Sequence, residues 1–247
     1  MKTLIKNAFF TLTILLSALP IASAQNGDPL PSAQDVVAKM MEFDARRQSE
    51  MIGYAATRHY VAVNKNRRAE MIVHVTCDSS GAKQFTVLSE EGSGSIRKRV
   101  FRKLLSEEAE ASRRGTRSST RLVPENYDFR VVGQETLESG PAYVLSAVPK
   151  TENKYLVDGK IWVNATDYSI VRIEGQPARN PSFWVHDVRF VHTYRKVGQF
   201  WFASSTHTTS EIKIFGPSEL TIENSDYVLH TPKDHVNEAV GVARLIQ

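Results

Sequence analysis

The 247-residue sequence is poor in cysteine. Cys77 is its only cysteine, so no disulfide can form within the chain. The pattern Met71-x-Val73-x-Val75-x-Cys77 places this residue on an apolar strand face, where we expect a small buried hydrophobe. Stability must therefore come from buried apolar surface, and a chain of this length can bury a sizeable core.

Charge of one sign is also scarce. The formal net charge is +4, and two of these charges, Lys2 and Lys6, lie in the first six residues. So small an excess does not predict a nucleic-acid partner. After residue 24 the sequence has no apolar run of the length, about 20 residues, that spans a membrane.

The first 24 residues are typical of a secretory signal peptide. Lys2 and Lys6 precede an uncharged run over residues 7–24, which ends in the small-residue cleavage pattern Ala22-Ser23-Ala24. A membrane anchor is the alternative, but the apolar core is short for a span. We therefore expect cleavage after Ala24 and a periplasmic location.

The rest of the chain is predicted to be mostly β-structure. Alternating apolar residues between short turns indicate about ten strands, and turns this short are typical of antiparallel hairpins. So many strands form either a sandwich or a curved, barrel-like sheet. The predicted strands cover residues 54–63, 69–77, 84–88, 127–135, 142–148, 155–164, 169–176, 185–197, 200–214 and 220–229.

Two segments have helical periodicity. Ser32, with Asp35 three residues later, resembles a capping box and begins a helix whose apolar stripe includes Met40 and Met41. That stripe predicts helix packing. Residues 95–112 form the second helix, which can fill part of a curved sheet and leave room for an apolar ligand. Residues 116–124 are polar and basic and predict a mobile loop.

We expect the interior of the sheet to be apolar and aromatic. Alternate residues from Trp184 to Tyr194 share one strand face. A packed core without a ligand is the alternative interpretation. The residues predicted to line a ligand cavity are Phe101, Leu104, Leu105, Trp162, Val171, Ile173, Trp184, Val188, Phe190, Tyr194 and Phe202.

The second predicted helix also carries a basic cluster. Such a cluster is either a solvated helix face or a contact surface for anionic lipid head groups or an acidic partner. With glycines on both sides, the helix is a candidate for a movable lid. The cluster consists of Arg97, Lys98, Arg99, Arg102 and Lys103.

The sequence offers no pattern for catalysis. Its seven histidines lack metal-ligand spacing. The run Gly92-Ser93-Gly94-Ser95 lacks the Gly-x-Ser-x-Gly spacing of a hydrolase nucleophile and predicts a flexible loop. We therefore expect no enzyme, no catalytic residue, no metal and no cofactor.

Residues 159–175, GKIWVNATDYSIVRIEG, resemble the outer-membrane lipoprotein-sorting superfamily of LolA-, LolB- and RseB-like proteins. Residues 180–185 (NPSFWV) and 198–202 (GQFWF) add to a resemblance that is best over residues 159–229. The resemblance implies a mainly β (α+β) fold, a half-open and strongly curved antiparallel β-barrel with helices covering the open side. We accordingly divide the chain into a signal peptide (1–24), a linker (25–34), a LolA-like domain (35–230) and a C-terminal tail (231–247).

The resemblance further implies a function. It implies a periplasmic carrier or binding protein that holds lipidated or acyl-bearing cargo, a lipoprotein or a lipid, in an apolar cavity. The alternative is an envelope sensory or protein-interaction module on the same fold. The implied partners are lipid or lipoprotein acyl chains and an inner- or outer-membrane protein, and we expect a monomer.

The sequence departs from the family at one functional position. In the family's well-known carrier an arginine after an early strand ties down the helical lid. The corresponding stretch here, Cys77-Asp78-Ser79-Ser80-Gly81, has no arginine. The resemblance therefore carries the fold and an apolar cavity to this chain, but not the lid mechanism, the particular cargo, or its donor and acceptor.

Overall fold

The structure is a computed structural model that describes residues 29–113 and 118–230. The predicted signal peptide, its cleavage site and the C-terminal tail lie outside the described residues. Within these two ranges, no helix is both long and apolar enough to cross a membrane.

Ten strands are present among the described residues. They are β1 (Gly53–Asn64), β2 (Arg67–Cys77), β3 (Lys83–Gly92), β4 (Tyr127–Leu137), β5 (Gly140–Pro149), β6 (Val157–Asn164), β7 (Ile170–Pro177), β8 (Val185–Val197), β9 (Phe200–Ile212) and β10 (Gly216–His230).

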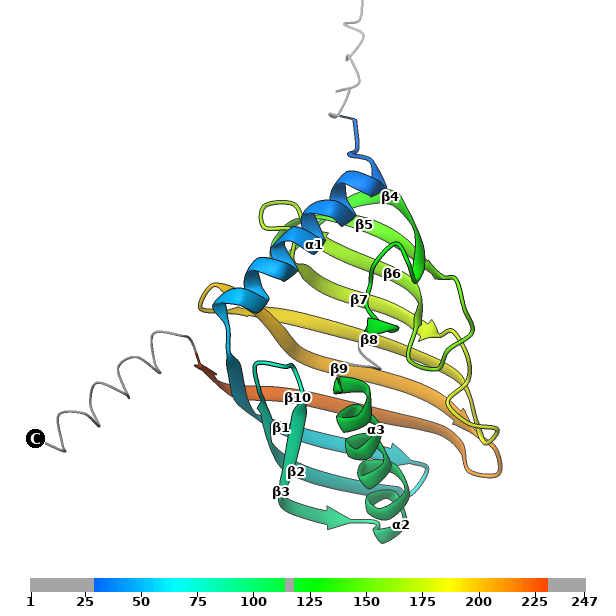
Figure 1. The fold of residues 1–247 in the computed structure, drawn as a ribbon. Coiled ribbons are helices and arrows are strands. Elements are labelled where there is room, and N and C mark those ends of the chain that lie inside the picture. Colours follow the sequence, from blue (N-terminus) through cyan, green and yellow to red (C-terminus); the bar gives the residue numbers. More distant parts are fainter. Residues whose placement is uncertain (1–28, 114–117, 231–247) are drawn as a thin grey trace, which may run out of the picture.

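The ten strands form one antiparallel sheet in the order β3-β2-β1-β10-β9-β8-β7-β6-β5-β4. The sheet is strongly curved and does not close, because β3 and β4 remain its two edges (Figure 1). The first three strands join the other seven through the pairing of β1 with β10. The predicted mainly β, half-open antiparallel barrel is therefore confirmed.

Helix α1 (Ala33–Glu50) begins where the sequence predicts. The Ser32 Oγ atom accepts a hydrogen bond from the Asp35 backbone N–H at 3.1 Å and donates one to the Asp35 carboxylate at 2.7 Å. Val36, Val37 and Met40 are buried against side chains of β4 to β7, which form one core cluster with them. The helix thus covers one half of the concave face.

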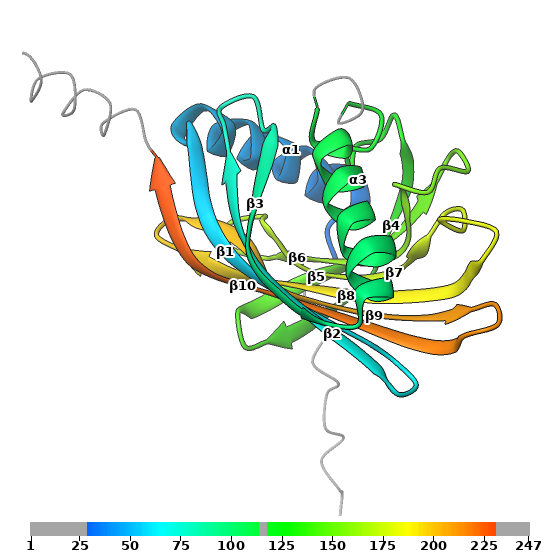
Figure 2. The same ribbon diagram turned by 90° about the horizontal axis from the view of Figure 1, so that it is seen from below.

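The second helical segment lies between β3 and β4, so it joins the two edges of the sheet. Its sequence predicts one helix, but the structure divides it into α2 (Gly94–Ile96), the π-helical turn η1 (Arg97–Phe101) and α3 (Arg102–Ser112). Phe101 and Leu105 are buried against β1 and β2. Figure 2 shows that α1 and α3 both lie on the concave side of the sheet.

The convex face carries a smaller apolar cluster. Ile161 packs beneath α1, and its neighbour Trp162 points to the opposite face because adjacent strand residues alternate. Trp162 and Val171 pack there with Ala142 and Val144, and the Trp162 indole donates to Glu135 at 2.9 Å. On β2, Met71, Val73 and Val75 are buried as predicted, whereas Cys77 is only half-buried at the strand end.

Candidate functional site

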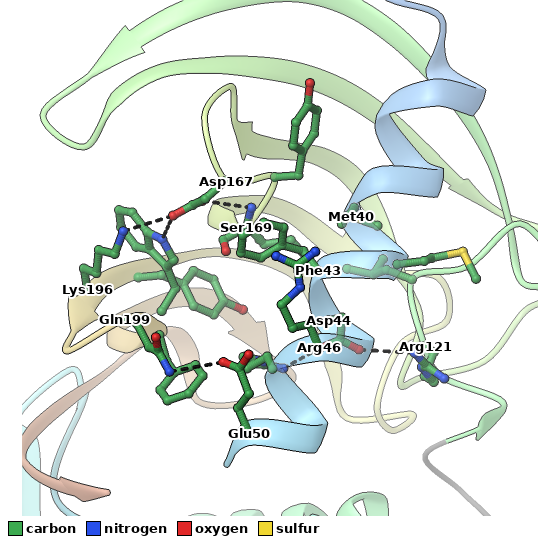
Figure 3. A pocket seen from close by; sticks show the side chains of 18 of the residues that line it. Met40, Phe43, Asp44, Arg46, Glu50, Arg121, Asp167, Ser169, Lys196 and Gln199 are labelled. Atoms are coloured by element: carbon green, nitrogen blue, oxygen red, sulfur yellow. Dashed lines mark hydrogen bonds and ion pairs between the residues drawn. The ribbon is translucent and has the colours of Figure 1, made fainter. Parts of the chain in front are cut away.

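A cavity of about 520 Å³ lies between α1 and the concave face of the sheet (Figure 3). One wall is the C-terminal half of α1. The opposite wall comes from the turn before β7 and from the ends of β8 and β9 that meet at their connecting turn. The loop over residues 121–123 closes one side. Pockets of a few hundred Å³ are the usual size for a small organic ligand.

The inner lining of the cavity is apolar and aromatic. Methionines and a phenylalanine of α1 lie on one side, and tyrosines and a phenylalanine of the sheet and its turns on the other, with Trp201 at the rim against the convex cluster. Burial raises the pKa of the Tyr194 phenol, so this side chain is neutral over the physiological range. An aliphatic chain would meet apolar surface on both walls. The apolar lining consists of Met40, Met41, Phe43, Leu122, Val123, Tyr168, Ile170, Tyr194, Phe200 and Trp201.

Charged and polar side chains lining the same cavity pair with one another. The Asp44 carboxylate on α1 accepts from Arg47 at 2.6 Å and from Arg121 at 3.2 Å. The Gln199 amide, in the β8–β9 turn, donates to Glu50 at the end of α1 at 3.1 Å (Figure 3). These contacts hold the C-terminal half of α1 to the loop and to the sheet at the surface, whereas its N-terminal half is packed in the core.

Asp167 is the acid of this lining that lies on the sheet side, in the turn before β7. Its carboxylate accepts from the Trp201 indole at 2.8 Å and from Lys196 at 3.2 Å. Burial alone would raise its pKa, but hydrogen bonds from Trp201, the Ser169 backbone and Lys196 together lower it. Asp167 is therefore ionised, and it fixes the aromatic wall beside the turn.

The other half of the concave face carries a cluster of charged side chains around the buried Arg58. Glu108 of α3 accepts from Arg58 of β1 at 2.6 Å and from Lys83 of β3 at 2.7 Å. Arg58 is only 7% exposed and also donates to the Tyr60 hydroxyl at 3.4 Å. Burial would raise the pKa of Glu108, but the positive charges of Lys83 and Arg58 lower it to about 2.

This cluster contains an arginine that contacts a covering helix, whereas residues 77–81 contain no arginine. Arg58 lies on β1, earlier than the stretch aligned with the family, and it connects the sheet directly to α3. The sequence does contain a signal for a buried arginine, because Arg58 lies between Ala56 and Tyr60 on the same apolar strand face, and both neighbours are buried. Its partner Glu108 is fifty residues away in sequence, so the pairing itself had no local signal.

His192 lies on β8 between the two halves. Its Nδ1 atom is 2.7 Å from the Thr206 hydroxyl, and burial lowers the pKa of the imidazole to about 4 although the Glu108 charge opposes this. The ring is therefore neutral at pH 7. Across residues 29–113 and 118–230, no group of three or more histidine, cysteine or acidic side chains is arranged to hold a metal ion.

The residues predicted to line a cavity are dispersed over the structure. Of these, Tyr194 lines the cavity described here. Their involvement in ligand binding stays a prediction. The others lie in the core beneath α1 (Ile173, Phe190), beneath or on α3 (Phe101, Leu104, Leu105), in the convex cluster (Trp162, Val171), at buried positions of β8 and β9 (Val188, Phe202) and on an exposed loop (Trp184).

The predicted basic cluster is partly neutralised. Arg97 and Arg102 both contact the Glu90 carboxylate, at 3.3 and 3.1 Å. Lys103 lies 4.0 Å from Glu107. Two further members, Lys98 and Arg99, are exposed and form no ion pair with a described residue. A head-group contact of this cluster stays a prediction.

Sequence reasoning missed most of the lining of the cavity. Met40 and Met41 pack in the core beneath α1, as the sequence predicts, and they also line the cavity, because a core stripe and a cavity wall have the same helical spacing. Leu122 and Val123 lie in a segment that is polar overall, so no periodic signal marked them.

Comparisons with known proteins give structural likeness alone. No family model matches the chain, and no curated protein matches it either. A DUF1329 family protein from Desulfovibrio piger is similar, with 11% identity and a TM-score of 0.44 over 81% of this chain and 94% of the other.

Two further solved structures come from the superfamily that the sequence resembles. An outer membrane lipoprotein-sorting protein domain from Vibrio parahaemolyticus has 15% identity and a TM-score of 0.43, over 84% of this chain and 98% of that one. A LolA superfamily protein from Nitrosomonas europaea has 10% identity and a TM-score of 0.40, over 84% and 97%. That superfamily is thus represented among the structural neighbours.

Proposed function

We propose that this protein is a periplasmic carrier or binding protein for lipidated or acyl-bearing cargo. The observation that supports it is the cavity of about 520 Å³ between α1 and the sheet, with apolar side chains on both walls. Burial of an aliphatic chain there would remove apolar surface of both partners from water. The apparent leader in the sequence supports the periplasmic location.

The charged side chains of the cavity suit a head group. Arg121 and Lys196 are each paired with a single carboxylate, Asp44 and Asp167 respectively. An anionic head group can replace or share these pairs while the acyl chain lies among Met40, Met41 and other apolar side chains. This role requires binding and release and no chemical step, so we propose a carrier and not an enzyme.

Binding of a fluorescent fatty acid tests the proposal. We expect saturable binding by the wild-type protein and an affinity loss of about tenfold or more for Met41→Asp, which puts a charge against the apolar wall. The matched control is Leu104→Asp, because Leu104 is also half-buried on a covering helix but lies on α3. Mass spectrometry of the purified protein should find a co-purified acyl compound.

The two variants also locate the site. If Leu104→Asp weakened binding and Met41→Asp did not, the ligand would lie under α3 and the assignment to α1 would be wrong. If the wild-type protein bound no probe and carried no acyl compound, the carrier function would be wrong.

One observation favours the second candidate, an envelope sensory or protein-interaction module. The half of the interior beneath α3 is filled by the protein's own side chains, with Phe101 fully buried. A protein that signals through partner contacts needs no ligand in its interior. Absence of probe binding, together with capture of a specific membrane protein, would support this candidate over the carrier.

A further inference from the structure

Three turns lie together at one end of the sheet. They are the β1–β2 turn, the loop over residues 178–184 before β8, and the β9–β10 turn, which lies between the other two; both views place them at the same end of the sheet (Figures 1 and 2). The Lys213 backbone N–H donates to the Trp184 carbonyl at 2.9 Å. The Asn64 amide donates to the Phe215 carbonyl at 3.2 Å. We refer to residues 64–67, 178–184 and 213–217 as the tip.

The tip exposes large apolar side chains. Phe183, Trp184, Ile214 and Phe215 are 38% to 81% exposed, and Ile214 is the most exposed of them. Phe183 and Trp184 contact each other edge to face, with ring centroids 5.5 Å apart. Exposed apolar side chains that gather at one place, rather than singly, mark an interaction surface.

The backbone conformation of Ile214 lowers the stability of the fold. Its φ of +76° is in the left-handed region, which is unfavourable for a β-branched residue and is normally occupied by glycine. Burial does not compensate for this strain, because the side chain is in water. The folded chain on its own thus gives no reason for an isoleucine at this position.

The tip is also cationic. Lys65, Arg67, Arg179 and Lys213 belong to it, and none of its three segments contains an acidic residue. The Lys213 ammonium lies 3.4 Å from the centroid of the Phe183 ring, and the Arg67 guanidinium lies 5.6 Å from that of Phe215. Positive charges therefore stand directly beside the exposed rings.

We propose that the tip docks on the anionic surface of a phospholipid membrane. Tryptophan and phenylalanine beside lysine and arginine are the combination that settles at the lipid–water interface, where rings and aliphatic groups enter the acyl boundary and cations contact phosphates. The side chains project from three separate turns, which suits a deformable lipid surface better than a shaped protein partner.

The inference goes beyond the proposed cargo and does not depend on it. The cavity is lined by the ends of β8 and β9 that meet at Gln199, whereas the tip begins at their other ends, Val185 and Ile212. A strand of 13 residues spans roughly 40 Å. Substitutions at the tip should therefore leave ligand binding in the cavity unchanged.

Co-sedimentation with vesicles tests the proposal on protein purified after export. We expect the wild type to bind phosphatidylcholine vesicles that contain phosphatidylglycerol, and to bind pure phosphatidylcholine much more weakly. The double variant Trp184→Ser/Ile214→Ser should lose about tenfold or more in affinity, as expected when large apolar side chains no longer enter the lipid. Val132→Ser/Val228→Ser, which removes two exposed apolar side chains elsewhere, should bind like wild type.

The charge arm uses Arg67→Glu/Lys213→Glu, which should abolish the preference for phosphatidylglycerol and the dependence on salt. All variants carry the same N-terminus, so a retained leader would affect them equally. The proposal would be overturned if the wild-type protein did not bind anionic vesicles, or if the Trp184→Ser/Ile214→Ser variant bound them like wild type. A tip that only mediates self-association, seen as a concentration-dependent dimer that the double variant loses, would also overturn it.

Discussion

The two helices that cover the concave face use different interactions. Beneath α3, Phe101 is fully buried and Glu108 binds two cations of the sheet, so the protein's own side chains pack this half. Beneath the C-terminal half of α1 a cavity remains, and exposed or half-exposed polar pairs hold the helix. The same curved sheet thus has a half packed with side chains beneath α3 and a half with a cavity beneath α1. The two halves differ in the helix that covers them.

This difference bears on which helix can move. The sequence makes residues 95–112 the candidate lid because glycines flank them. In the structure that helix is held by the buried Arg58 and by Phe101, whereas the C-terminal half of α1 is held over the cavity by contacts such as Asp44–Arg121 and Glu50–Gln199. A lid hypothesis therefore fits α1 better, because contacts near water cost less free energy to break.

The largest expected effect is at Glu108. Glu108→Gln leaves Arg58 and Lys83 without a counter-charge in a mostly buried site, so we expect a loss of about 2–3 kcal/mol in the free energy of unfolding at pH 7. Urea unfolding measures it. Glu107→Gln on the same helix is the matched control, since Glu107 has a similar exposure and binds Lys154 at 2.7 Å, but Lys154 is more exposed than Arg58, the buried partner of Glu108. It should cost less than about 1 kcal/mol.

Equal losses of unfolding free energy in the two variants would contradict the comparison between the halves, because the ion pairs of Glu108 would then contribute no more than ordinary surface pairs.

The pH dependence of stability offers a second measurement for Glu108. The folded pKa of Glu108, about 2, lies below its usual value of 4.5, so its contribution is present above pH 4.5 and is lost as the pH falls toward 2. Glu108→Gln should lack that component of acid unfolding.

A smaller effect is expected at His192, between the halves. Because burial lowers its folded pKa to about 4 from 6.5, the unfolded chain takes up a proton first as the pH falls. Stability should decrease between pH 6.5 and 4, by roughly 2 kcal/mol after allowance for partial exposure. His192→Gln removes the titration and should flatten unfolding free energy across this window.

The pKa of His192 also shows whether water reaches the interior of the sheet. An NMR titration that gave His192 a pKa near 6.5 would mean that water reaches the centre of the sheet, and the filled half would then be smaller than we describe. A pKa near 4 would extend the dry region from α3 as far as β8.

The sequence predicted the fold better than the site, for physical reasons. Strand β8 was predicted with the bounds it has, since turn residues and alternation are local signals. The π-helical turn over residues 97–101 has no such signal, because it depends on how Phe101 packs against β1 and β2. The cavity wall on α1 and the Arg58–Glu108 pair likewise depend on contacts between segments distant in sequence.

The smallest effect on stability, and the most informative for function, is expected for Asp44→Asn. This change weakens the pairs with Arg47 and Arg121, which are partly exposed, so the free energy of unfolding should fall by less than about 1 kcal/mol. Hydrogen exchange of amides in the C-terminal half of α1 should nevertheless quicken, and a fatty-acid probe should enter faster. Amides of α3 should exchange as in the wild type, because Glu108 still holds that helix. If amide exchange quickened in α3 and not in α1, the mobile helix would be α3, as the sequence suggests. The comparison between a firmly held α3 and a more easily displaced α1 would then be reversed.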